Sequence, residues 1–211
     1  MNILKEIGKQ IKYPRGLFGK LMLTVMTKST IEPARWTASL MNIQPDDDII
    51  EIGFGNGANI KFLSQQASGG SVTGIEVSDT AIEMASDKNS KAISEDRVKL
   101  HKAPGSQLPF KDGEFDKAIT VATVYVIEDP GAVFKEMYRV LKPSGRGAVT
   151  FPFREKFGKY KPVMAEKFYM HKLEDLEKLF RDAGFINCKT ESNDQVRFGA
   201  HCMHGEKPAV N

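Results

Sequence analysis

Short apolar runs and amphipathic stretches alternate along the chain from Asp48 onward. Runs rich in β-branched and aromatic residues, bounded by turn formers, predict strands. Apolar residues that recur every three or four positions predict helices with one buried face. Strands are expected at residues 48–53, 71–76, 97–101, 117–126, 146–151, 185–191 and 196–204, and helices at 57–67, from 78, at 130–141 and at 173–183.

This alternation of strands with helices of about a dozen residues predicts right-handed βαβ units. We therefore expect an α/β fold, a Rossmann-like, doubly wound and mostly parallel sheet of seven strands. In such sheets ligands bind at the carboxyl ends of the strands. The candidate chemistry should therefore lie in the loops that follow Gly53, Glu76, His101, Val121 and Phe151.

The segment before the first strand has a helical pattern of its own. Ile3, Ile7 and Ile11 recur at a spacing of four, and residues 13–16 break the pattern. A second helix is expected to start at Glu32-Pro33-Ala34. We expect residues 1–45 to form a helical lid on a main domain at 46–211, within one structural domain. Residues 152–170 resist assignment.

Composition and charge exclude several classes of protein. The 211 residues carry a net charge of +3, which is too small to indicate nucleic-acid binding. The two cysteines lack metal-ligand spacing, so neither a metal nor a disulfide scaffold is expected. The chain shows no signal-peptide pattern and no membrane span, so a cytoplasmic location is expected.

The first 45 residues are distinctly basic, with seven Lys or Arg against two Glu. Such a segment fits a solvated helical face, and it also fits peripheral contact with a membrane surface or an anionic substrate. The pattern alone does not choose between these interpretations.

A glycine-rich loop follows the first expected strand, at Gly53, Gly55 and Gly57. Alternate glycines let the backbone approach a ligand closely, and the next helix offers unpaired N–H groups. Glu76 ends the second expected strand, where a carboxylate can accept hydrogen bonds from both hydroxyls of a ribose. Together these features predict a cofactor that contains adenosine, with NAD as a competitor.

The spacing of the loop separates the two kinds of cofactor. A dinucleotide site requires its third glycine at position 58, where Ala58 stands. Glu51, just before the loop, is also unfavourable beside a pyrophosphate, whereas it suits a ligand with an ammonium and a sulfonium group.

At this point the sequence resembles the class I S-adenosylmethionine-dependent methyltransferases, and within them the menaquinone/ubiquinone-type small-molecule subgroup. Four segments carry the resemblance in the family's order, together with the acidic Glu76. They are Glu51–Gly57, Leu108–Asp116 (Leu-Pro-Phe-Lys-Asp-Gly-Glu-Phe-Asp), Glu136–Gly145 and Ala183–Phe185.

The resemblance implies S-adenosylmethionine as the methyl donor and S-adenosylhomocysteine as the product. The loop would hold the methionine end, Glu76 the ribose, and Val77 with residues 103–106 the adenine. Pro104 departs from the family, which often has an acidic residue there. The implied cofactor residues are Glu51, Gly53, Phe54, Gly55, Asn56, Gly57, Glu76, Val77, Pro104, Gly105, Ser106 and Val121.

Candidate catalytic groups are Tyr125, which stands where many relatives have a histidine, and His171. Either could orient the acceptor or remove its proton. Motifs for methylating adenine, pyrimidines or catechols are missing after the fourth strand, so we expect a small, partly apolar or aromatic acceptor. Five aromatic residues after the fifth strand would line its pocket: Phe153, Phe157, Tyr160, Phe168 and Tyr169.

The alternative to an enzyme is a catalytically inactive relative that keeps the fold and acts by binding a protein or membrane partner. The sequence leaves the acceptor, the methylated atom and the oligomeric state open.

Overall fold

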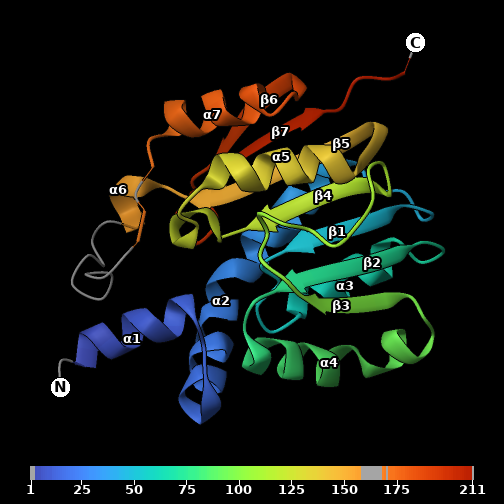
Figure 1. Ribbon diagram of the computed structural model, residues 1–211. Coiled ribbons are helices and arrows are strands. Elements are labelled where there is room, and N and C mark those ends of the chain that lie inside the picture. The colour runs from blue at the N-terminus through green and yellow to red at the C-terminus, as the bar shows by residue number, and fades with distance from the viewer. Residues whose placement is uncertain (1–2, 158–167, 170, 211) are drawn as a thin grey trace.

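The computed structural model describes residues 3–157, 168–169 and 171–210 (Figure 1). Seven strands form one sheet in the order β3-β2-β1-β4-β5-β7-β6. All neighbours are parallel except β7, which runs antiparallel to both β5 and β6. The strands are β1 Asp48–Ile52, β2 Ser71–Glu76, β3 Val98–Lys102, β4 Phe115–Val121, β5 Leu141–Pro152, β6 Ile186–Asn193 and β7 Ala200–Glu206.

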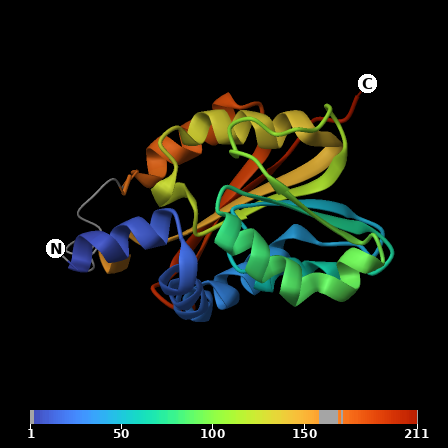
Figure 2. The ribbon, with the colours of Figure 1, turned by 60° about the horizontal axis from the view of Figure 1, so that its bottom comes forward.

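Helices cover both faces of this sheet, as Figure 2 shows. α5 and α7 pack on one face and enclose a core that includes Phe134 and Phe180. α2, α3 and α4 cover the other face, whose core includes Ile60 and Met41. The helices are α1 Ile3–Lys12, α2 Gly16–Met41, α3 Ala58–Gln66, α4 Asp79–Ser94, α5 Pro130–Val140, α6 Arg154–Phe157 and α7 Leu173–Asp182.

The predicted fold class is confirmed, because the sheet is doubly wound and mostly parallel. The strand order reverses between β1 and β4, which pair with each other in parallel at the centre of the sheet. At such a switch point the loops on either side diverge and leave a crevice at the carboxyl ends of the strands. The glycine loop after β1 lies at this crevice.

The helix predicted to start at Glu32 is wrong, because α2 begins at Gly16 and continues through Pro33. The proline is tolerated because the turns after it are fixed by tertiary contacts. Thr37, fully buried, lies with its hydroxyl oxygen 2.7 Å from that of Thr150 on β5, and Met41 is also fully buried. Packing therefore overrides the local preference of proline for a helix start.

The fourth strand is shorter than predicted, since β4 ends at Val121. Ala122 has a φ of 56°, a left-handed conformation that turns the chain out of the sheet. A 3₁₀-helix, η1 Val124–Val126, follows. Tyr125 therefore lies on a helical turn at the strand end, and not within a strand.

Candidate functional site

The glycine loop is held in a conformation that only glycine adopts easily. Gly53, Gly55 and Gly57 have φ angles of 77°, 56° and 73°. A Cβ on Gly53 would lie 2.3 Å from the Thr123 methyl carbon, and one on Gly57 would lie 2.5 Å from Ala85 Cβ. A Cβ on Gly55 would meet nothing closer than 3.7 Å. The outer two glycines thus allow close packing, whereas the middle one borders open space.

Glu76, at the end of β2, is fixed against this loop. Its Oε2 accepts a hydrogen bond from the Gly55 N–H at 3.2 Å. Its Oε1 accepts from the N–H groups of Val77 at 2.7 Å and Ser78 at 3.2 Å. Burial raises the pKa of Glu76, and the three backbone N–H groups oppose that effect. The carboxylate is therefore oriented before any ligand arrives.

Glu51, on β1 beneath the loop, is only 2% exposed. Its Oε1 accepts a hydrogen bond from Asn59 Nδ2 at 2.8 Å, while Oε2 has no hydrogen-bond partner among the residues that the structure describes. The pKa of the Glu51 carboxyl is raised to about 7, mainly by burial. The hydrogen bond from Asn59 opposes this rise, and the nearby charge of Glu76 adds to it. A buried carboxylate oxygen without a donor is suited to a cationic ligand group.

These groups border a cavity of about 480 Å³, which we call the glycine-loop cavity. α1 and α2 close one side of it with Ile11, Leu23 and Met26. Seven of the residues predicted to bind the cofactor line it together: Gly53, Gly55, Glu76, Val77, Pro104, Gly105 and Ser106.

A recess of about 80 Å³ shares Gly53 and Gly55 with this cavity. Four more of the predicted residues line the recess: Glu51, Phe54, Asn56 and Val121. Gly57 lines neither space and instead accepts a hydrogen bond on its carbonyl oxygen from Asn89 at 3.1 Å, which joins the loop to α4.

A larger cavity of about 730 Å³, here called the outer cavity, lies beyond the carboxyl end of β5. Tyr125 lines both cavities, so this side chain lies between the two spaces. Tyr125 is 7% exposed, its burial raises the pKa of the phenol, and its ring stacks on Phe168 at 5.8 Å between centroids. His171 also lines the outer cavity, and its Nε2 is buried with no hydrogen-bond partner in the described part of the chain.

The structure also brings in His201, which is not among the residues predicted for the site. β7 inserts beside β5 and pairs His201 with Phe151, so the imidazole reaches the wall of the outer cavity. Tyr169 lines the same cavity. Of the other aromatic residues predicted there, Phe153 packs on His201, whereas Tyr160 and the side chain of Phe157 lie outside the described residues.

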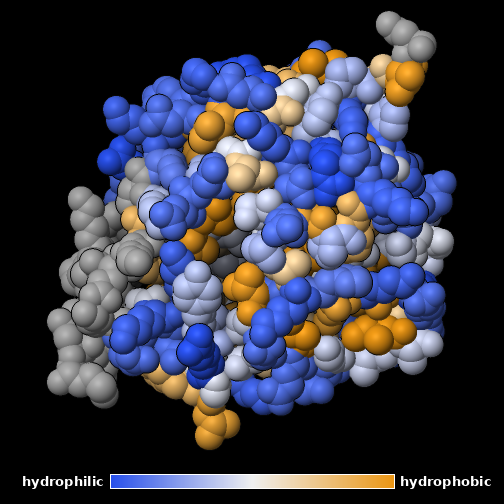
Figure 3. Space-filling view, in the orientation of Figure 1, coloured by the Kyte–Doolittle hydropathy of each residue, from blue (hydrophilic) through white to orange (hydrophobic). Residues whose placement is uncertain are grey.

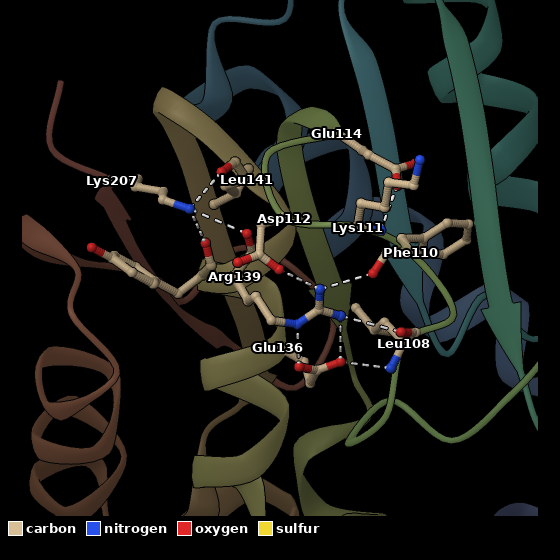
Figure 4. A network of polar contacts seen from close by, with 10 residues as sticks. Leu108, Phe110, Lys111, Asp112, Glu114, Glu136, Arg139, Leu141 and Lys207 are labelled. Carbon is tan, nitrogen blue, oxygen red and sulfur yellow. Dashed lines mark hydrogen bonds and ion pairs between the residues drawn. The ribbon is translucent and has the colours of Figure 1, made fainter. Parts of the chain in front are cut away.

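Two of the family-like segments meet in a polar network below the site, shown in Figure 4. The Arg139 guanidinium on α5 bonds to both carboxylate oxygens of Glu136, at 2.6 and 2.9 Å, and to Asp112 at 2.8 Å. It also donates to the carbonyl oxygens of Leu108 and Phe110, at 3.2 and 2.8 Å. These segments therefore fix the loop that leads from β3 to β4, and none of their residues lines the glycine-loop cavity or the outer cavity.

Replacing Arg139 by Ala is expected to lower the free energy of unfolding by about 2–4 kcal/mol, because it leaves Glu136 and two loop carbonyls without their shared donor. Urea unfolding of the variant measures the loss. Arg181→Ala is the matched control, since Arg181 is 54% exposed and lies 3.9 Å from Glu177. The free energy of unfolding of Arg181→Ala is expected to differ from the wild-type value by no more than about 0.5 kcal/mol. Equal stability of the two variants would contradict the assigned role of Arg139.

The fold and the site together define an α/β protein with a cavity at a topological switch point, lined by residues that fit an adenosine-containing ligand. Comparison with known proteins specifies the class. A family model described as a methyltransferase domain matches residues 50–149. The chain is 26% identical over 176 residues to YdaC, an uncharacterized methyltransferase of Bacillus subtilis, and the match covers 83% of this chain and 92% of that protein.

Two further comparisons agree. The chain is 29% identical over 113 residues to the ubiquinone/menaquinone biosynthesis C-methyltransferase UbiE of Geotalea daltonii, covering 53% of this chain and 48% of that one. Phosphoethanolamine N-methyltransferase 2 of Haemonchus contortus, solved with phosphomonomethylethanolamine and S-adenosylhomocysteine, superposes with a TM-score of 0.70 at 17% identity, covering 84% of this chain and 52% of that one. Residues 50–149 thus match a methyltransferase domain, and the chain resembles the S-adenosylmethionine-dependent methyltransferases in sequence and in fold.

The chain spans between 41% and 58% of the length of three of its curated relatives, so their acceptors are not carried over to it. The residues present fit S-adenosylmethionine, the cofactor that the sequence predicts. The unpartnered Glu51 Oε2 suits the ammonium, and the prepositioned Glu76 suits the ribose hydroxyls. Among residues 3–157, 168–169 and 171–210, no group of three His, Cys, Asp or Glu is placed to hold a metal ion.

Proposed function

We propose that this chain transfers a methyl group from S-adenosylmethionine to a small, partly apolar or aromatic acceptor that binds in the outer cavity. The observation that carries the proposal is that Tyr125 lines both the glycine-loop cavity and the outer cavity. The bound donor would supply an activated methyl group: the acceptor nucleophile would bond to the methyl carbon as the bond from that carbon to sulfur breaks, and S-adenosylhomocysteine would leave. The protein contributes mainly alignment and the exclusion of water.

The donor would lie along the carboxyl ends of β1 and β2. Glu51 and the glycine loop would hold the amino-acid end, and Glu76 the ribose. Pro104 cannot accept a hydrogen bond from the adenine amino group through its side chain. Asp129, the N-cap of α5, lines the same cavity and is the acidic residue we assign to that contact. Its Oδ1 already accepts from the Ala132 N–H at 3.0 Å, which fixes the carboxylate in place.

On the acceptor side we assign Tyr125 to orienting the nucleophile and His171 to accepting its proton. The high pKa of the Tyr125 phenol keeps it protonated at neutral pH, so it can donate a hydrogen bond. Nε2 of His171, which has no hydrogen-bond partner among the described residues, offers an acceptor within the outer cavity. Where the acceptor loses its proton before attack, His171 supplies the base.

The N-terminal segment at 1–45 is proposed to be the lid of this site. The linker between its two helices and the first residue of α2 are tied to the start of α4, because the Ser78 hydroxyl donates to the Pro14 carbonyl at 2.6 Å and the Gly16 N–H donates to the Thr80 hydroxyl at 3.2 Å. Lys12, the last residue of α1, has its Nζ over the Tyr169 ring, 5.2 Å from its centroid. The lid therefore contacts the walls of both cavities.

Gly55→Leu should abolish cofactor binding and methyl transfer, since the new side chain would fill the open space where the donor approaches. Calorimetry with S-adenosylhomocysteine and release of that product with a panel of small acceptors measure the two effects. Gly16→Leu is the matched control, because Gly16 has a similar φ of 59° and open surroundings but lines neither cavity.

Cofactor binding that survives in Gly55→Leu would contradict the assigned donor site. A protein that binds the cofactor tightly but never forms product with any acceptor would instead support an inactive binding module. The Gly16→Leu control is expected to retain at least half of the wild-type activity, which shows that a left-handed glycine position alone does not explain the loss.

A further inference from the structure

The outer face of α2 carries a stripe of exposed apolar side chains. Leu17 is 86% exposed, Leu21 57% and Val25 53%, and their spacing of four residues places them on one face of the helix. Phe18, 40% exposed, and Tyr13, 50% exposed, flank the stripe. In Figure 3 apolar residues protrude at the lower edge of the molecule, where Figure 1 places the start of α2.

This stripe is not needed to hold the helix in place. The inner face of the same helix packs inward through Leu23, which is 6% exposed and lines the glycine-loop cavity with Met26. Lys20 further ties the helix to α4 through an ion pair of 2.8 Å with Glu83. Five of the eight large hydrophobic residues that are exposed in the described chain lie between residues 13 and 25. Such a concentration on one helix face marks an interaction surface.

Cationic side chains border the stripe at both ends. Arg15 is the N-cap residue of α2, and Lys28 continues the stripe three residues after Val25. Both are exposed, and within the described residues neither forms a salt bridge. Lys12 Nζ lies 5.6 Å from the Tyr13 ring centroid, so a third cation stands beside the apolar surface. The whole surface is therefore apolar at its centre and positive at its edges.

We propose that this α2 face, from Tyr13 to Lys28, docks on the surface of an anionic phospholipid bilayer. The aliphatic and aromatic side chains would enter the interface, and the cations would meet the phosphate headgroups. A second copy of the chain is a poorer occupant. Symmetric pairing of two stripes would place Arg15 and Lys28 of one copy against like charges of the other.

Docking in this way brings the active site close to the bilayer. The two faces of α2 are separated by about one helix diameter, roughly 10 Å. The glycine-loop cavity, the proposed donor site, lies behind the inner face, where Leu23 and Met26 line it, so docking would hold the donor site near the bilayer surface. The docking itself does not depend on the methyl transfer proposed above.

Co-sedimentation of the full chain with vesicles tests the proposal without cofactor or acceptor. Vesicles that contain phosphatidylglycerol should bind the protein, with an affinity that falls as salt is raised, whereas pure phosphatidylcholine vesicles should bind it at least tenfold more weakly. Leu17→Glu/Leu21→Glu should remove binding. Arg15→Ala and Lys28→Ala should each weaken it about fivefold.

The matched control is Ile186→Glu/Val210→Glu, which adds the same charge at exposed apolar residues elsewhere, and it should bind as the wild type does. Calorimetry with S-adenosylhomocysteine checks that each variant is folded, and Leu17→Ala/Leu21→Ala replaces the Glu variant if that one fails. Equal binding to both kinds of vesicle, no binding to either, or a self-association that the Leu17 and Leu21 substitutions abolish would each overturn the proposal.

Discussion

Replacing Glu76 by Ala should weaken the binding of S-adenosylhomocysteine about 100-fold or more. Each hydrogen bond between a ribose hydroxyl and a carboxylate contributes about 1.5–3 kcal/mol, and two of them correspond to at least that change in affinity. The carboxylate is already oriented by the N–H groups of Gly55, Val77 and Ser78, so little of this contribution is lost in ordering the side chain. Isothermal titration calorimetry measures the change.

A ligand that lacks the ribose 2′-hydroxyl separates this contact from a general disturbance of the loop. The wild-type protein should bind that ligand about tenfold more weakly than S-adenosylhomocysteine, whereas Glu76→Ala should no longer distinguish the two. Glu76→Gln is expected to be intermediate, because its amide nitrogen would face the Gly55 N–H. If both ligands lose the same factor in the Ala variant, Glu76 supports the loop and does not bind the ribose.

The features that could be predicted from the sequence depend on the residue type at a position and on the connection between neighbouring strands. Gly53, Gly55 and Gly57 have left-handed φ angles, which favour glycine. The sequence shows this as a glycine at every second position of the loop. Glu76 ends a strand that is parallel and adjacent to β1, so its place beside the loop follows from the βαβ connection. Neighbouring parallel strands bring their carboxyl ends together whatever the remaining chain does.

The features that were missed depend on contacts between distant segments. The residues around Pro33 do not indicate that α2 continues through it. The turns beyond Pro33 are stabilised by buried contacts with β5, a strand that is distant in the sequence. His201 reaches the outer cavity only because β7 returns antiparallel between β5 and β6. The strand at 196–204 was placed too early, since β7 spans Ala200–Glu206, and pairing with β5 sets that register.

Glu51 should make cofactor binding depend on pH below neutrality. In the free protein its burial raises the carboxyl pKa to about 7, with the Asn59 hydrogen bond opposing and Glu76 adding to the shift. A raised carboxyl pKa favours folding most when the group is protonated, so that contribution is lost as pH rises from 4.5 through about 7. The ammonium of the ligand instead requires the ionised form, so binding must release the proton at lower pH.

The dissociation constant for S-adenosylhomocysteine should therefore fall nearly tenfold per pH unit between about pH 5 and 6.5 and level off above about 7. Titrations in buffers with different ionisation enthalpies should show close to one proton released per ligand at pH 5.5. Glu51→Gln is the control: its affinity should be weaker at pH 7.5, and any pH dependence that remains reports Glu76, whose pKa is also raised by burial. The same steep dependence in both proteins would remove Glu51 from the ammonium site, because a residue that no longer titrates cannot be the source of the released proton.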